Sequence, residues 1–352
     1  MRLVIFLTLL FCSLTGYSCT AIIVSSKASA DGRPYIFKNC DTEKHDVCVR
    51  VFGGGNRYRF LALVNSNYFL PDRVIAGFNE KGFSIINTNT HNQNGNRKDN
   101  VENTRLMRKA LEKCASISDF QHMLDTIRRP MHLNTCFGVM DATGSLAIIE
   151  AGNKKYVIYD ANSTKNGWIV RGNYAHCGDT IKLYGYEREK ALDTFVIGHM
   201  KNKKLKFEDI VFEASRFDCI PRKQTSSAIL IHGIKKRESP LSTVAWTACG
   251  SPLTTPFIPL WLTANNDLPN VVTSKVKGTA SSLALKSLKT RRKLHSVTSR
   301  EKVEEVRNLE QNIVNASLKA VREKRKKNNK ESDRVVLRFY QWVDKYIRKE
   351  WL

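Results

Sequence analysis

The sequence predicts an α+β fold with a basic, helical C-terminal extension that is rich in Lys and Arg. Up to about Leu262, short apolar runs typical of strands alternate with stretches at helical spacing. The 42% hydrophobic content supports a buried core, and basic residues dominate after about Asp267. We therefore predict a main domain over residues 19–265 and a helical region over residues 266–352, preceded by a targeting segment over residues 1–18.

The predicted strands are short and separated by turn signals, such as Asp31-Gly32-Arg33-Pro34 between the first two. One helical stretch is predicted from about Val101 to Arg128, because apolar residues recur there at helical spacing, and another from Tyr184 to His199. The predicted strands span residues 19–26, 35–41, 59–64, 82–90, 136–141, 145–151, 155–160, 227–232 and 243–248.

The C-terminal region is expected to form two polar helices, over residues 301–327 and 333–352. They either pack on the main domain or project from it. From Lys275 to Leu352 there are 22 Lys and Arg against 9 Asp and Glu, so this part carries +13 of the formal charge of +24. Such an excess favours an anionic surface as a partner, with nucleic acid less favoured, and a solvated helix face would have the same composition.

The first residues have the layout of a secretory signal peptide. Arg2 precedes a ten-residue apolar run (LVIFLTLLFC), and the small residues Gly16 and Ser18 stand three and one before Cys19. The run is shorter than the roughly 20 residues of a transmembrane helix. We predict cleavage after Ser18 and a secreted or periplasmic protein. A lipid anchor on Cys19 is less favoured, because Gly16 stands where a lipobox usually has Leu.

Metal and cofactor signatures are absent from the sequence. Nine cysteines occur, but no CxxC pair, zinc-type Cys/His spacing or HExxH motif does. Phosphate-binding glycine loops and the GxSxG motif are missing as well. The sequence therefore implies no cofactor, and it leaves the disulfide pattern and the oligomeric state open.

A cysteine at a new N-terminus can act as nucleophile and base together. The thiolate is the reactive form, and an ordinary thiol is mostly protonated at neutral pH. A freed α-amine has a pKa of about 7.7–8.0, so it can accept the proton of its own thiol. Cleavage after Ser18 would give Cys19 this arrangement. An ordinary strand cysteine or half of a disulfide is the structural alternative.

Several short motifs follow Cys19 in a fixed order. Together they resemble the N-terminal nucleophile (Ntn) hydrolases of the choloylglycine hydrolase and penicillin V acylase family, including isopenicillin-N acyltransferase-like members, from Cys19 to about Leu262. The motifs are Cys19-Thr20, FKNCD (37–41), GFNEKGF (77–83) with Asn89 ten residues past Asn79, Arg171-Gly172-Asn173-Tyr174, Tyr186-Glu187-Arg188, and the segment 242–261.

The resemblance implies a four-layer αββα sandwich and an amide-cleaving enzyme that works through a thioester. In this scheme Cys19 is the nucleophile and, through its amine, the base, and Asp41 holds the amine or the thiol. Asn89 and Asn173 donate to the oxyanion, and Arg188 stabilises charge near the nucleophile. The implied substrates are linear acyl amides of the bile-salt, penicillin V, N-acyl amino acid or small peptide type, with acyl transfer to an amine as a variant.

Three positions near the predicted site depart from the family pattern or leave a choice. Lys38 stands where the family usually has Arg, which removes a planar, five-donor group. Asn87 competes with Asn89 for the oxyanion role, and Cys40 has no assigned role.

The alternative function is a catalytically inactive secreted protein that docks on anionic surfaces through its basic C-terminal region.

Overall fold

A computed structural model of the chain describes most of the sequence. Apart from Ser18, the predicted signal peptide lies outside the described residues. The described ranges are 18–42, 44–66, 72–93, 101–181, 183–201, 203–293, 300–324 and 329–352.

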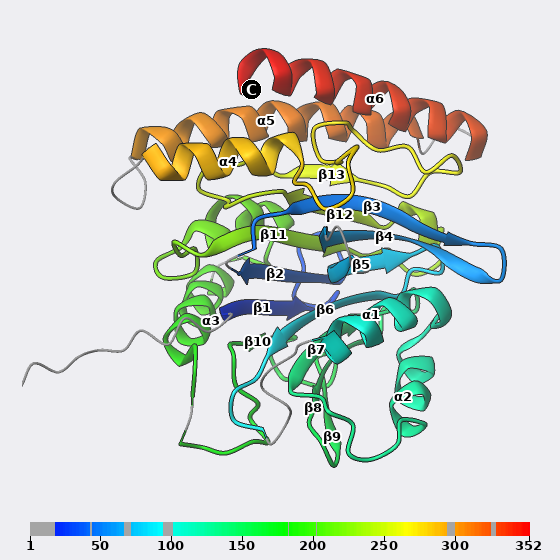
Figure 1. The fold of residues 1–352 in the computed structure, drawn as a ribbon, viewed down its shortest axis with the longest axis vertical. Coiled ribbons are helices and arrows are strands. Elements are labelled where there is room, and N and C mark those ends of the chain that lie inside the picture. The colour runs from blue at the N-terminus through cyan, green and yellow to red at the C-terminus, as the bar shows by residue number, and fades with distance from the viewer. Residues whose placement is uncertain are drawn as a thin grey trace, which may run out of the picture.

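Two antiparallel sheets stack face to face in the middle of the molecule (Figure 1). The six-stranded sheet has the order β10-β1-β2-β11-β12-β13, and the seven-stranded sheet runs in sequence order from β3 to β9. The strands of the first sheet are β1 (Ser18–Val24), β2 (Tyr35–Asp41), β10 (Trp168–Arg171), β11 (Thr225–His232), β12 (Val244–Ala248) and β13 (Ile258–Leu260). Those of the second are β3 (Val47–Gly54), β4 (Arg57–Asn65), β5 (Arg73–Asn79), β6 (Ser84–Asn89), β7 (Thr135–Met140), β8 (Leu146–Ala151) and β9 (Tyr156–Asp160).

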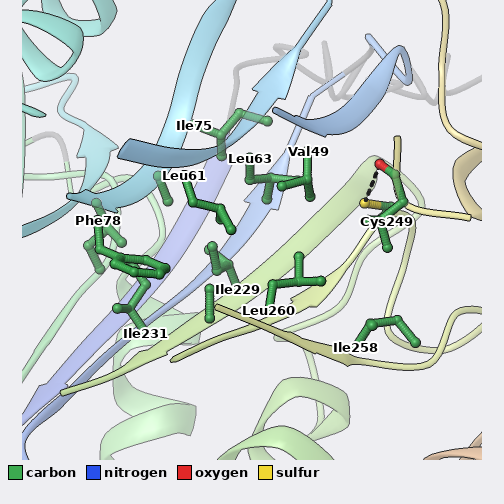
Figure 2. Close-up of a cluster of buried hydrophobic side chains, with 14 of the residues drawn as sticks. Val49, Leu61, Leu63, Ile75, Phe78, Ile229, Ile231, Cys249, Ile258 and Leu260 are labelled. Atoms are coloured by element: carbon green, nitrogen blue, oxygen red, sulfur yellow. Dashed lines mark hydrogen bonds between the residues drawn. The ribbon is translucent and has the colours of Figure 1, made fainter. Parts of the chain in front are cut away.

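The central strands are buried on both faces, and their side chains alternate between two cores. In β1, Ala21 and Ile23 belong to the core between the sheets, whereas Ile22 and Val24 belong to the core on the outer side of the six-stranded sheet. Figure 2 shows the inter-sheet core, where side chains of β4 and β5 meet those of β11 and β13. This period of two fixes which side chains of β1 can reach the space between the sheets.

Helices cover the outer face of each sheet. The helices α1 (Val101–Lys113) and α2 (Ile117–Asp125) share a core with the seven-stranded sheet. The helix α3 (Tyr186–Met200) and the short helical turns Asp209–Glu213 and Ala214–Arg216 share one with the six-stranded sheet. The predicted α+β fold and its αββα layering are thereby confirmed.

Some elements differ from the sequence prediction. The helix expected over residues 101–128 is two helices, because Ser116 caps α2 and forms a capping box with Asp119. The strands β3, β5, β10 and β13 and the helix α4 (Ser282–Lys293) were not predicted. The three-residue strand β13 contains Pro259, so no alternating pattern marks it.

The basic C-terminal region packs on the sheets rather than projecting from them. Its helices α4, α5 (Arg300–Lys324) and α6 (Asn329–Glu350) lie together beside β13 in Figure 1. Apolar residues of α5 and α6 extend the inter-sheet core, and the Tyr340 hydroxyl both accepts from the Trp261 N–H (2.7 Å) and donates to the Trp261 carbonyl (3.1 Å). None of the described helices is long and apolar enough to cross a membrane.

A buried ion pair fixes α5 against the main domain. Arg216 Nη2 lies 2.7 Å from Glu310 Oε1, and the two side chains are 3% and 1% exposed. The same Glu310 oxygen accepts the backbone N–H of Phe257 at 2.9 Å. Removing one partner of such a pair leaves a charge in a site that water does not reach.

We expect Glu310→Gln to lower the free energy of unfolding by about 3 kcal/mol, because Arg216 would keep its charge without a counter-charge. The exposed pair of Arg338 and Glu323 provides a matched control. There, Glu323→Gln should cost less than about 1 kcal/mol. Urea unfolding of the three proteins measures both effects, and equal losses in the two variants would contradict this role of Glu310.

Candidate active site

Cys19 lies in β1, between β10 and β2, and is 4% exposed. In the β1–β2 register it stands directly opposite Cys40, and Ser18 stands opposite Asp41. Opposed residues of an antiparallel pair point to the same face. Both Cys19 and Cys40 belong to the inter-sheet core, so their sulfur atoms lie between the two sheets. Lys38, two residues before Cys40, faces the same way.

The backbone nitrogen of Cys19 is held by a side-chain amide. It donates to Asn173 Oδ1 at 2.7 Å, and Asn173 is the second residue after the end of β10. Asn173 Nδ2 in turn donates to the backbone carbonyl of Asn89 at 2.8 Å, at the end of β6. Asn173 therefore links the six-stranded sheet, which carries Cys19, to the seven-stranded sheet, which carries Asn89.

Arg188 reaches the same point from the first turn of α3. Its Nη2 donates to Asn173 Oδ1 (2.7 Å) and more weakly to the Cys19 carbonyl (3.5 Å), and its Nε donates to Thr20 Oγ1 (3.0 Å). The side chain is buried, so it is not a surface helix residue. Gly185, at φ +80°, permits this placement, because a Cβ there would lie 2.4 Å from Arg188 Nη2.

Asp41 is buried at the end of β2, and its carboxylate accepts the hydroxyl of Thr225 at 2.6 Å. The backbone N–H of Asp41 donates to the Cys19 sulfur. Burial raises the pKa of the Asp41 carboxyl to about 7. Asp41 thus contacts Cys19 through its backbone, and the predicted contact of its carboxylate with a freed amine stays a prediction.

The two candidate asparagines of β6 have different surroundings. Asn87 Oδ1 accepts from Lys38 Nζ at 2.9 Å, and Asn87 Nδ2 donates to Asn89 Oδ1 at 3.2 Å. Asn103 Nδ2 also donates to Asn89 Oδ1, at 3.1 Å. Because Asn89 Oδ1 accepts two hydrogen bonds, the orientation of this side-chain amide is fixed, and Nδ2 is left as its donor. The backbone carbonyl of Asn89 accepts from Asn173. Asn89 is therefore the asparagine of β6 that contacts Asn173, whereas Asn87 holds Lys38.

The Cys19 thiol is strongly acidified by these neighbours. Its pKa falls from 9.0 to about 6, chiefly through a hydrogen bond from the Cys40 thiol. Burial acts in the opposite direction, while Lys38, the Asp41 backbone and Arg188 lower the pKa further. The pKa of Cys40 is raised by donating that hydrogen bond and by burial. The pair therefore holds one thiolate, on Cys19, and one thiol, on Cys40.

The structure brings the five predicted site residues together, from β1, β2, β6, the segment after β10 and α3. Sequence reasoning missed three polar neighbours: Thr20, Thr225 and Asn103. Thr20 lies in the Cys19-Thr20 motif, so its position was visible although its bond to Arg188 was not. The other two have no local signal, because they come from distant elements.

A pocket of about 790 Å³ adjoins the site on the side of Arg188. Apolar side chains line part of it, among them Ile181 and Leu183, which are 84% and 40% exposed. Two guanidinium groups, of Arg188 and the exposed Arg222, also line it, together with the carboxylate of the exposed Glu187. The combination suits a ligand that carries both an apolar part and a charged group.

One group among the described residues has the spacing of metal ligands. Single ligand atoms of His199, Asp209 and Glu213 lie within 4.8 Å of one another. Each already has a protein partner: His199 Nε2 lies 3.2 Å from Glu213 Oε2, and Asp209 pairs with Lys203 at 3.7 Å. None of the three belongs to the site around Cys19, and the arrangement is explained by ion pairing.

Comparison with known proteins matches part of the chain to a family model. Residues 30–192 match the family model described as acyl-coenzyme A:6-aminopenicillanic acid acyl-transferase. The match begins after Cys19, so it does not include the nucleophile position. No curated protein matches the chain significantly.

Solved structures of amide hydrolases resemble the chain at low sequence identity. A mutant conjugated bile acid hydrolase from Clostridium perfringens has a TM-score of 0.50 at 12% identity, over 75% of this chain and 98% of its own. The Caenorhabditis elegans ortholog of N-acylethanolamine-hydrolyzing acid amidase has a TM-score of 0.47 at 15% identity, over 60% and 92%. Penicillin V acylase from Agrobacterium tumefaciens has 0.44 at 12%, over 74% and 89%.

The shared fold and the matched family model agree with the resemblance seen in the sequence. Two antiparallel sheets between helices are common to this chain and the bile acid hydrolase. The chain shares the fold of the bile acid hydrolase, and residues 30–192 are similar to the acyl-coenzyme A:6-aminopenicillanic acid acyl-transferase family.

Proposed function

We propose that the chain, freed of residues 1–18, is a secreted amidohydrolase that cleaves a linear acyl amide through a thioester on Cys19. One observation carries the proposal: Asn173 and Arg188 converge on the main chain of Cys19, whose thiol is acidified. A buried strand cysteine in a purely structural role requires neither feature.

Cleavage after Ser18 would turn the Cys19 amide nitrogen into an amine at the same place. That amine would keep Asn173 Oδ1 as its acceptor, at the 2.7 Å found for the amide. Because Ser18 stands opposite Asp41, its removal leaves the amine beside the buried Asp41. A carboxylate there would stabilise the protonated amine.

The reaction then follows from the positions of these groups. The Cys19 thiolate attacks the amide carbonyl, and the developing oxyanion is stabilised by amide N–H donors of Asn89 and Asn173. The protonated amine of Cys19 gives its proton to the leaving nitrogen, and a thioester remains. Water, activated by the same amine, hydrolyses the thioester, and a second amine in place of water would give acyl transfer.

The pocket beside Arg188 favours an N-acyl amino acid among the candidate substrates. Its apolar wall, which includes Ile181 and Leu183, suits an apolar acyl group. Arg222 is exposed in the same pocket and can form a bidentate contact with a carboxylate on the amine portion. A neutral amine portion would leave this guanidinium without a ligand.

We expect Arg222→Gln to lower kcat/KM for an N-acyl glycine about tenfold or more, because it removes a charge-assisted contact of about 1.5–3 kcal/mol. The matched substrate is the ethanolamide with the same acyl chain, which lacks the carboxylate. Its kcat/KM should change little in the variant. Steady-state kinetics on both substrates tests this, and an equal loss on both would assign Arg222 a role other than carboxylate recognition.

We expect the secreted chain to begin at Cys19 and its thiol to react as a thiolate at unusually low pH. Because the pKa is lowered to about 6, the iodoacetamide labelling rate of Cys19 should rise with pH, reach half of its maximum at about pH 6 and level off at higher pH. The labelling rate of an ordinary thiol would still increase with pH up to about pH 9. Peptide-resolved mass spectrometry measures both the N-terminus and the rates.

Cys19→Ser should abolish both this low-pH labelling and amide cleavage, whereas Cys177→Ser should change neither, since Cys177 is the half-exposed cysteine outside the site. A chain that retains residues before Cys19, or a labelling midpoint near pH 9, would rule out the proposed nucleophile.

A second function, binding to an anionic membrane surface, is favoured by the outer face of α6. At 100° per residue, the exposed residues of α6 other than Glu350 fall on one stripe in which six cations surround a glutamine, with Leu337 and Trp342 at its edges. Cations flanked by an apolar and an aromatic side chain suit the lipid headgroup region. The members of this α6 stripe are Lys330, Arg334, Leu337, Arg338, Gln341, Trp342, Lys345, Arg348 and Lys349.

Changing Arg334, Lys345 and Arg348 to Gln should weaken binding to phosphatidylserine-containing vesicles on the order of a hundredfold, since each cation contributes about 1 kcal/mol near such a surface. The control changes Lys154, Lys155 and Lys165 to Gln, which removes the same charge from exposed positions near β9. Vesicle sedimentation at several salt concentrations measures both. Equal losses of vesicle binding in the two variants would show that binding depends only on the net charge of the protein. If the protein bound duplex DNA but no vesicles, the proposed partner would be nucleic acid rather than a membrane.

A further inference from the structure

Among the cysteines that the structure describes, Cys40 is the one that lies beside the proposed nucleophile. It stands opposite Cys19 in the β1–β2 register, and both residues face the inter-sheet core. Opposed residues of antiparallel strands have Cα atoms about 4.5–5.5 Å apart, and a disulfide spans Cα separations of about 4.4–6.8 Å. The two sulfur atoms can therefore bond while the strands stay paired.

The two thiols also differ in pKa, so that one is a thiolate and the other a thiol. Among the eight cysteines of the described residues, Cys19 alone has a lowered pKa, and the pKa of each of the other seven is raised. The thiolate is the form that reacts with peroxides, so oxidation should begin at Cys19. Cys40, which stands opposite Cys19 and faces the same inter-sheet core, is placed to react next.

We propose that Cys19 and Cys40 form an oxidisable dithiol, a modification site at which a hydroperoxide converts the two thiols into a disulfide. The Cys19 thiolate attacks one peroxide oxygen, the O–O bond breaks, and Cys19 becomes a sulfenic acid as the other oxygen leaves as water or alcohol. The Cys40 sulfur then attacks the Cys19 sulfur and expels the sulfenic oxygen as water. The peroxide is reduced by two electrons, and the two thiols are oxidised by two.

The disulfide would remove the sulfur that attacks the substrate, and this consequence rests on the proposed function of Cys19. Directly opposed Cβ atoms lie about 4.5–5.5 Å apart, whereas the Cβ atoms of a disulfide average about 3.8 Å. The strands must draw together slightly to form the bond. A bond under such strain is more easily reduced, which makes the site reversible.

The test is a titration of the mature protein with hydrogen peroxide, followed by dithiothreitol. The expected product is a mass lower by about 2 Da and a peptide pair linked through Cys19 and Cys40. Amide cleavage should fall in step with this linkage and return on reduction. The linkage itself is read by mass, so it tests the dithiol even if the chain has no amidase activity.

Two variants test the role of Cys40, and the amide-cleavage rate of each treated variant is divided by the rate of the same variant before treatment. In Cys40→Ser the resolving thiol is missing, so peroxide should drive Cys19 to the sulfinic acid, and dithiothreitol should not restore activity. Cys177→Ser should behave as the unmodified protein does. The proposal is overturned if no Cys19–Cys40 peptide forms, or if Cys40→Ser recovers as completely as the unmodified protein.

Discussion

The antiparallel pairing of β1 with β2 is the constraint on which the site depends. Its register sets Cys19 opposite Cys40 and Ser18 opposite Asp41, and it does so inside a sheet whose strands are buried on both faces. A shift of one residue would turn Cys19 away from the space between the sheets. The apolar partners of β1 on both faces, Ile23 on one and Ile22 on the other, oppose such a shift.

A small number of neighbouring groups stabilise the negative charge of the Cys19 thiolate in this buried region. The Cys19 thiolate is stabilised by the Cys40 thiol, Lys38 and Arg188, in an environment where burial alone would keep it protonated. Lys38 keeps the positive charge of the arginine expected in the family, and it lies between Asn87 Oδ1 and the carbonyl of Ile75. The contacts that fix the geometry of Cys19 come instead from the donors of Arg188 and from the acceptor oxygen of Asn173.

The C-terminal helices add a surface without disturbing this arrangement. The buried pair of Arg216 and Glu310 and the hydroxyl of Tyr340 attach α5 and α6 to the main domain through polar contacts inside an apolar core. The side of α6 turned away from that core remains cationic. The α6 stripe and the pocket beside Arg188 are thus parts of one packed molecule.

The sequence by itself predicted most strands, since period-two apolar runs need no tertiary information. Its resemblance to a known family implied the layering and the candidate site residues, through local signals such as Cys19, the motif ending in Asp41 and the position of Arg188. Only the tertiary structure distinguished the surroundings of Asn87 and Asn89, since their difference lies in distant partners such as Asn103. It also revealed the partner of Cys40, because strand register is set by packing on both faces of a sheet rather than by the residues of either strand alone.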